Sequence, residues 1–187
     1  MQFEAYLQLE PRADLLRNYE LALVPGPHQT EEYAFHSIAS MRPELSPAQV
    51  RGLTDVRMDR QQKIAEGPLR EFQALIEEQA LRRMVGDRNI MRGQLEHLVD
   101  ASEDPRNSLR VLAESLGCHP GLAGGFMLMR FPEATPDVVW LETMNRTVYF
   151  DEEADVDCYV EVFSDLWGRA LDPAGTRARL TKMIKEL

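Results

Sequence analysis

Apolar residues recur at spacings of three and four over residues 153–170, directly after the acidic run Asp151-Glu152-Glu153. This periodicity predicts an amphipathic helix whose apolar face is wide enough to close one side of a hydrophobic core. The face comprises Val156, Tyr159, Val160, Phe163, Leu166, Trp167 and Ala170. We interpret it as a packing surface rather than as a cofactor-binding one.

Capping residues predict the starts of four further helices. Thr30, Asp87 and Asp172 each stand where a side-chain oxygen can accept from the free N–H groups of a first helical turn. Ser46-Pro47-Ala48-Gln49 has the pattern of a capping box with proline at the first helical position. The expected helices cover residues 31–41, 47 to about 64, 88 to about 102, and 173 onward.

Short apolar and β-branched runs, separated by Gly, Pro and Asn, predict strands in the second half of the chain. These runs are residues 108–113, 126–131, 138–143 and 147–150, the last two joined by a short hairpin loop at 144–146. Residues 19–24 are a further candidate, and residues 72–76 fit either a strand or a helix. The sequence therefore predicts an α+β fold, with helices packed on a small, mainly antiparallel sheet formed late in the chain.

Composition is typical of a single globular domain. The chain has 187 residues and a hydrophobic fraction of 44%, with proline and glycine spread along it, so we expect one domain over residues 1–187. No apolar run approaches the ~18–20 residues of a membrane span, and the N-terminus does not resemble a secretory signal. We therefore expect a cytoplasmic protein without membrane contact. In it Cys118 and Cys158 are expected as buried, reduced thiols, with a single disulfide between them as the alternative.

The charge balance bears on nucleic-acid binding. Lys and Arg number 21 against 31 Asp and Glu, which gives a net charge of -10. Phosphate contacts need clustered basic side chains, so the balance argues against direct nucleic-acid binding by this chain.

The sequence lacks the signatures of common catalytic and cofactor sites, namely GxGxxG, the Walker loop, GxSxG and HExxH. The glycine-rich segment 121–125 precedes a predicted strand rather than a helix, which favours a turn over a phosphate cradle. A helix start separates His28 from His36, and no metal-ligand spacing links them to His97 or His119. We therefore expect neither a cofactor nor a metal ion.

Glu142 is the strongest sequence candidate for acid–base chemistry or for anchoring a ligand. With regular strand alternation it lies on the same sheet face as Trp140, and Tyr149 takes a comparable place on the next strand. A carboxylate held beside an aromatic ring can be a buried acid with a raised pKa. It can equally lie on a solvated face, and the sequence leaves both alternatives open.

A series of segments, in order along the chain, resembles one family. The segments are Tyr19-Glu20, Leu23-Val24-Pro25-Gly26, Gln29-Thr30-Glu31-Glu32-Tyr33-Ala34, Arg57-Met58-Asp59-Arg60-Gln61, Ala80-Leu81-Arg82-Arg83, Val85-Gly86, residues 91–98, His119-Pro120-Gly121-Leu122, Gly125-Phe126, Arg130-Phe131-Pro132 and residues 137–142. They resemble the C-terminal regulatory domain of XRE-type helix-turn-helix regulators, the antitoxin-like transcriptional regulators of filamentous soil bacteria. The resemblance spans nearly the whole chain. It implies a sensor-like domain that normally follows a DNA-binding helix-turn-helix and often works beside a small partner protein, and it supplies no catalytic residues.

The chain departs from that family in two ways. Its helix-turn-helix is missing, because Met1 stands just before the regulatory segment, so we expect either a shortened chain or a natural stand-alone domain. The family's Val-Pro-Gly-Leu-Leu-Gln-Thr has Pro27 and His28 at its two leucine positions, and His36 adds a further polar aromatic. A segment that normally packs has thereby gained a side chain whose ordinary pKa is about 6.5.

Two functional hypotheses follow. The first is an effector- or partner-binding domain that does not bind DNA by itself, takes a small hydrophobic ligand or a small partner protein, and can form a homodimer. Its ligand-binding candidates are His28, Tyr33, His36, His119, Phe126, Trp140, Glu142 and Tyr149. The alternative is a stand-alone natural-product enzyme of the cofactor-independent cyclase or isomerase class. It would need an apolar pocket, with His28 as base and Glu142 or Tyr149 as acid.

Overall fold

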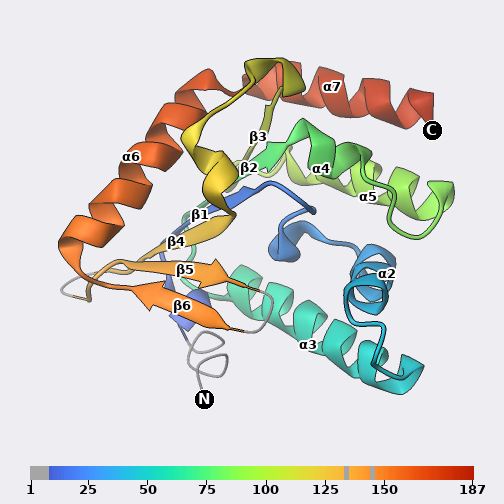
Figure 1. Cartoon of the computed structure of the whole chain (residues 1–187), viewed down its shortest axis with the longest axis horizontal. Coiled ribbons are helices and arrows are strands. Elements are labelled where there is room, and N and C mark those ends of the chain that lie inside the picture. Colours follow the sequence, from blue (N-terminus) through green and yellow to red (C-terminus); the bar gives the residue numbers. More distant parts are fainter. Residues whose placement is uncertain (1–8, 133–134, 144–145) are drawn as a thin grey trace.

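The computed structural model describes residues 9–132, 135–143 and 146–187. It has the predicted α+β fold, with one mixed sheet between helices (Figure 1). The strands are β1 (Leu15–Glu20), β2 (Glu71–Glu77), β3 (Asn107–Leu112), β4 (Phe126–Arg130), β5 (Val138–Glu142) and β6 (Thr147–Phe150). The α-helices are α2 (Glu31–Met41), α3 (Pro47–Glu66), α4 (Glu78–Arg82), α5 (Arg88–Ala101), α6 (Glu153–Arg169) and α7 (Pro173–Glu186). Short 3₁₀ helices are η1 (Glu10–Arg12), η2 (Gly26–His28), η3 (Glu114–Leu116) and η4 (Pro120–Ala123).

Across the described residues the strand order of the sheet is β3-β2-β1-β4-β5-β6. β2 pairs in parallel with both β1 and β3, whereas the β1–β4, β4–β5 and β5–β6 pairs are antiparallel. The sheet is larger than predicted, because β1 and β2 from the first half of the chain form its centre. The carboxyl ends of these two strands therefore meet at one edge, where open α/β sheets commonly place ligands. Of the predicted hairpin loop, residues 144 and 145 lie outside the described part.

The first central strand differs from the prediction. β1 covers Leu15–Glu20 rather than residues 19–24, because the chain leaves the sheet after Glu20. The Val24 N–H donates to the Tyr33 hydroxyl at 3.3 Å, and the Val24 carbonyl accepts from the Gln29 side-chain amide at 2.7 Å. These side-chain bonds satisfy backbone groups that a strand would have paired with its neighbour. Residues 72–76, for which strand and helix both remained open, lie in β2.

Helices cover both faces of the sheet (Figure 1). α6 lies on one face, where Phe163 and Leu166 join a core cluster with Tyr19 and Leu128. This contact confirms the predicted apolar stripe of residues 153–170 as a packing surface. On the opposite face, α5 and α7 close a cluster over β2 and β3, and Ile64 of α3 joins a cluster over β1 and β4.

The predicted helix starts are confirmed by their caps. The side chains of Thr30, Asp87 and Asp172 accept hydrogen bonds from backbone N–H groups in the first turns of α2, α5 and α7. Ser46 and Gln49 form the complete capping box of α3. These bonds satisfy N–H groups that otherwise lack an intrahelical acceptor.

Two surface features complete the fold. None of the described helices is both long enough and apolar enough to cross a membrane. Cys118 and Cys158 are free and exposed, so the expectation that both thiols are buried is wrong. Cys158 lies beside the apolar stripe of α6 rather than on it, and Cys118 lies in the loop between η3 and η4.

Candidate ligand-binding site

His28, the candidate base, is a buried core residue. It is 4% exposed and stacks on Phe72, with the two ring centroids 4.7 Å apart. Its Nε2 has no hydrogen-bond partner among the described residues. Burial, with a smaller contribution from His97, lowers the pKa of His28 to about 4. His28 is therefore neutral at pH 7 and shielded from solvent.

The turn around His28 is held by side chains from α3 and α5. Gln94 of α5 donates through Nε2 to the His28 carbonyl at 2.7 Å and accepts through Oε1 from the Thr30 N–H at 2.8 Å. Gln61 of α3 donates to two further carbonyls of the turn, each 2.8 Å away. These bonds give residues 24–30 a structural explanation that needs no ligand.

Tyr33 and His36 lie on α2 in different surroundings. Tyr33 is fully buried, and its hydroxyl accepts the Val24 hydrogen bond described above. His36 is half-buried and meets the ring of Phe35 edge-on, with the centroids 5.5 Å apart. Neither side chain lines the hollows described below.

The late strands bring Trp140 and Tyr149 together, with their rings edge-on and the centroids 5.0 Å apart. Glu142 is exposed, which favours the solvated alternative for this carboxylate. Phe72, on which His28 stacks, lies on β2, and Glu142 lies on β5, three strands away in the sheet order. The described residues thus do not bring the candidate base His28 beside the candidate acid Glu142.

Glu20, at the carboxyl end of β1, is an acid with a raised pKa that lies close to the late strands. Burial raises the pKa of Glu20 to about 7, and repulsion from the Glu142 carboxylate contributes to the increase. Asn18 Nδ2 donates weakly to Glu20 at 3.4 Å and to the Phe126 carbonyl at 3.2 Å. Asn18 Oδ1 is buried without a described partner. Sequence reasoning missed Glu20, whose environment depends on the distant strand β5.

A second polar cluster lies at the same sheet edge but on the α6 face. Glu77, the last residue of β2, accepts from the Tyr19 hydroxyl at 2.9 Å and contacts His119 Nε2 at 3.0 Å. Tyr19 also contacts Phe126, with the ring centroids 5.6 Å apart. His119 is buried, and its Nδ1 has no partner in the described part of the chain. His119 and Phe126 are thus joined through Tyr19 in the protein interior.

The glycine-rich segment before β4 is a turn, as predicted. Gly121 lies so close to Tyr19 that a Cβ atom at this position would stand 2.7 Å from the Tyr19 Cζ atom. Gly124 has a φ of 152°, which L side chains rarely adopt. Close packing and backbone conformation therefore explain these glycines without a bound phosphate.

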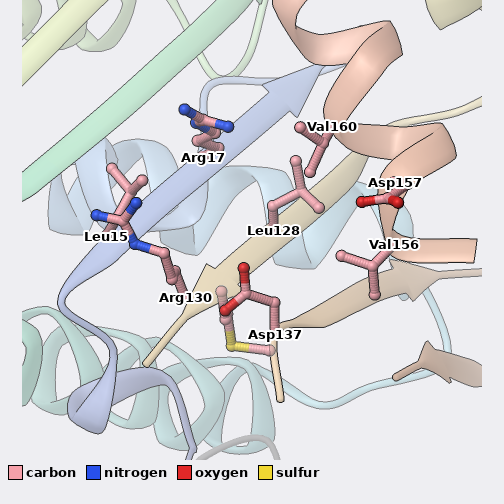
Figure 2. A pocket seen from close by; sticks show the side chains of 9 residues that line it. Leu15, Arg17, Leu128, Arg130, Asp137, Val156, Asp157 and Val160 are labelled. Carbon is pink, nitrogen blue, oxygen red and sulfur yellow. The ribbon is translucent and has the colours of Figure 1, made fainter. Parts of the chain in front are cut away.

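A hollow of about 260 Å³ lies between the first half of α6 and the sheet (Figure 2). Its lining residues are Leu15, Arg17, Leu128, Met129, Arg130, Asp137, Val156, Asp157 and Val160. Leu15 and Arg17 come from β1, Leu128 to Arg130 from β4, and Val156, Asp157 and Val160 from α6. None of the sequence-predicted site residues lines this hollow.

Arg17 is the unusual residue of the hollow. It is half-buried in the centre of the sheet, donates through Nε to Gln73 at 2.9 Å, and lies over the Phe163 ring at 5.6 Å. No carboxylate of the described residues stands within ion-pair distance of it. Burial, together with repulsion from Arg130, lowers the pKa of Arg17 below its ordinary value, and attraction to Glu71 and Asp137 offsets this only in part. Arg17 stands two residues after Leu15 and two before Tyr19, so it places a charge on an otherwise apolar strand face. This interruption of the apolar pattern is visible in the sequence.

A second, more acidic hollow of about 360 Å³ adjoins the first. Asp137, Val156 and Asp157 line both hollows, and Asp151 and Glu153 add two further carboxylates. Burial, together with repulsion from Asp14, raises the pKa of Asp137. We call the two adjoining hollows the groove: guanidinium groups line only the first hollow, and carboxylates line both.

The groove is chemically suited to binding. Neither hollow is lined by a Ser, Thr, Cys or His that could serve as a nucleophile or an imidazole base. Among the residues that the structure describes, no group of three His, Cys, Asp or Glu side chains could hold a metal ion. What the groove offers is fixed charge of both signs over an apolar floor.

Two comparisons with known proteins bear on the identity of the chain. No curated protein matches it. The model of a family described as a domain of unknown function, DUF5753, matches residues 3–182. The matched region includes every strand of the sheet and all the residues that line the groove. The chain therefore belongs to the DUF5753 family.

Proposed function

We propose that this chain is an effector-binding domain related to the antitoxin-like transcriptional regulators, and that the groove beside α6 binds the effector. The observation that carries the proposal is the half-buried Arg17, which faces the hollow and has no carboxylate of the described residues within ion-pair distance, although Glu71 and Asp137 act on its charge from further away. A guanidinium taken partly out of water loses hydration, and an anionic group restores that loss through charge-assisted hydrogen bonds.

Arg17 and Arg130 both line the hollow and repel each other, so an anion placed between them would be attracted by both. Arg130 is more exposed and contacts Asp14 at 3.5 Å, so its charge is already partly balanced. Arg17 is therefore the principal anchor of the proposed site. Arginine suits this role because its planar group can bind a carboxylate or phosphate in a bidentate manner.

The net charge of -10 supports an effector rather than nucleic acid as the direct ligand. The two arginines of the hollow stand beside Asp137 and Asp157, which would repel a polyanion. The alternative as a cyclase or isomerase is less well supported, because His28 is buried and lies apart from Glu142.

The test is calorimetric titration of a set of small carboxylates and phosphates into the wild-type protein and two variants. Arg17→Gln removes the proposed anchor, and Arg169→Gln removes an exposed arginine near the end of α6 as a matched control. We expect at least one anion to bind the wild type and the control alike, and about tenfold or more weaker to Arg17→Gln.

Equal affinity in all three proteins, or no binding by any anion of the set, would contradict the proposal. Gel-shift assays with duplex DNA at physiological salt should show no retardation by the chain alone.

A further inference from the structure

We propose that the effector is a small zwitterion, an aliphatic amino acid whose carboxylate binds Arg17 and whose ammonium group binds Asp157. This inference rests on the proposed function and deepens it, because it assigns a second charge and a size to the ligand. Three features of the groove carry it: its anion-binding end, its acidic end and its apolar floor.

The basic end fixes the position of the carboxylate. Arg17 reaches the hollow from the middle of β1, and Arg130 from the end of the neighbouring strand β4 (Figure 2). In the strand register Leu128 stands opposite Arg17, and Arg130 opposite Leu15. The two guanidinium groups thus come from adjacent strands on one face, and Arg17 is the one that we assign to the carboxylate, because Arg130 already contacts Asp14.

The acidic end argues for a cation on the same ligand. Asp157 projects from α6 into the hollow opposite the strands (Figure 2), and no hydrogen bond or ion pair to it is found in the described part of the chain. Asp137 lines both hollows, and Asp151 and Glu153 extend the negative charge beyond it. A purely anionic ligand would be repelled by these carboxylates, whereas a primary ammonium group would be attracted.

The floor and volume limit the rest of the ligand. Leu15, Leu128, Val156 and Val160 supply an apolar surface beside the charged groups of the first hollow. The first hollow, at about 260 Å³, lies at the small end of the range of ligand sites, which favours a small ligand. An amino acid with a branched aliphatic side chain is such a ligand, and it would bury its apolar part against this floor.

Three matched probes test the inference in the full chain. L-leucine carries both charges, 4-methylpentanoate lacks the ammonium group, and 3-methylbutylamine lacks the carboxylate. We expect calorimetry to give the tightest binding for L-leucine, and about tenfold or more weaker binding for each single-charge probe.

Two carboxylate variants assign the ammonium subsite. Asp157→Asn should weaken the binding of L-leucine about tenfold, because L-leucine carries the cation. The affinity for 4-methylpentanoate, which carries no cation, should stay unchanged or increase slightly. Asp165→Asn, an exposed carboxylate two turns further along α6, should change neither affinity. Asp157 is exposed, so its replacement is not expected to disturb folding.

The outcomes separate this inference from the proposed function. If 4-methylpentanoate binds as tightly as L-leucine, or if Asp157→Asn binds L-leucine normally, the zwitterion is wrong while an Arg17-dependent anion site stands. If L-leucine does not bind but another small anion binds through Arg17, the inference again fails alone. If neither L-leucine nor any anion of the set binds, both proposals fail.

Discussion

At the scale of single residues, two buried titratable groups couple stability to pH in opposite directions. His28 is buried in its neutral form with a pKa of about 4, and Glu20 is held in its protonated form up to a pKa of about 7. Both shifts have burial as their main cause, and in both the charged form is the one that the fold disfavours. Neither shift could be derived from the sequence, because each depends on what covers the side chain.

The first prediction concerns His28→Phe. The folded pKa of His28 lies below its unfolded value of about 6.5, so wild-type stability is lost as pH falls from about 6.5 through 4. Phenylalanine keeps the stacking on Phe72 and removes the unpartnered Nε2. In urea unfolding, the free energy of unfolding of the variant relative to that of the wild type should increase by about 2–3 kcal/mol between pH 7 and pH 4. A constant difference across that range would contradict the burial argument, and His36→Phe should leave the acid loss unchanged.

The second prediction concerns Glu20→Gln. The folded pKa of Glu20 lies above its unfolded value of about 4.5. The stability that protonated Glu20 gives the fold is therefore complete below pH 4.5 and is lost as pH rises through about 7. The glutamine variant keeps an acceptor for Asn18 and cannot ionise. Its stability relative to wild type should increase by about 1–3 kcal/mol from pH 5 to pH 8.

Glu142→Gln is the matched variant for this prediction. It removes a repulsive neighbour of Glu20 and so lowers the pKa of Glu20; the loss of stability with rising pH should persist, but be smaller and end at a lower pH than in the wild type. An unchanged transition would show that the Glu142 carboxylate does not act on Glu20.

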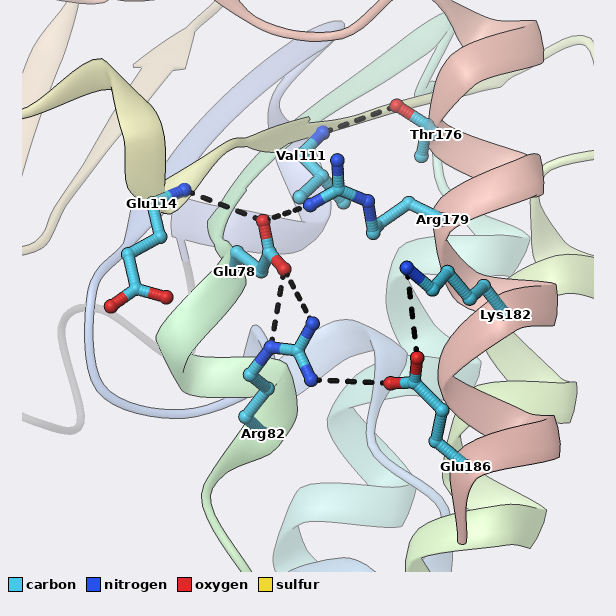
Figure 3. Close-up of polar contacts among 8 residues, drawn as sticks. All are labelled: Glu78, Arg82, Val111, Glu114, Thr176, Arg179, Lys182 and Glu186. Atoms are coloured by element: carbon cyan, nitrogen blue, oxygen red, sulfur yellow. Dashed lines mark hydrogen bonds and ion pairs between the residues drawn. The ribbon is translucent and has the colours of Figure 1, made fainter.

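At the scale of elements, one buried carboxylate ties the centre of the sheet to the last helix (Figure 3). Glu78, the first residue of α4, is 3% exposed and accepts from Arg82 at 2.8 Å, from Arg179 of α7, and from the Glu114 N–H at 3.3 Å. Arg82 also contacts Glu186 at 3.4 Å, close to the end of α7. α4 follows β2 without a break, so the contacts of Glu78 connect the end of β2 directly to α7.

The third prediction follows from this network. Glu78→Gln removes a buried negative charge that accepts from two partly exposed arginines, and should lower the free energy of unfolding by about 2–3 kcal/mol in urea titrations. Glu186→Gln removes an exposed carboxylate of the same network and should cost no more than about 1 kcal/mol. Equal effects of the two changes would refute the importance of burial at Glu78.

Local signals explain why the helices were predictable and the centre of the sheet was not. Thr30, Ser46 and Asp87 cap their own first turns, so a few neighbouring residues define each helix start. β1 and β2, in contrast, pair across more than fifty residues, for example Leu16 with Phe72, and no local pattern defines that register.

At the scale of the whole molecule, the site residues predicted from the sequence lie apart from the groove that we propose as the binding site. His28, Tyr33, His119 and Phe126 are buried between layers, where they support the turn at residues 24–30 and the sheet edge. The groove forms only when β1, β4 and α6 meet, and the sequence offers one sign of it, the charge of Arg17 between Leu15 and Tyr19. The resemblance to regulators implies a binding domain only as an expectation, and it gives no position for a binding site.

The most direct test of the central claim is to map which residues respond when a ligand binds. In a ¹H–¹⁵N NMR titration, the small anion that binds most tightly in calorimetry would be added to the labelled full chain. The proposal predicts chemical-shift changes concentrated at Arg17 and its neighbours in β1, in β4, and in the first half of α6. Changes confined to α2 and α3, or no changes at saturating ligand, would contradict the assignment of the effector site to this groove.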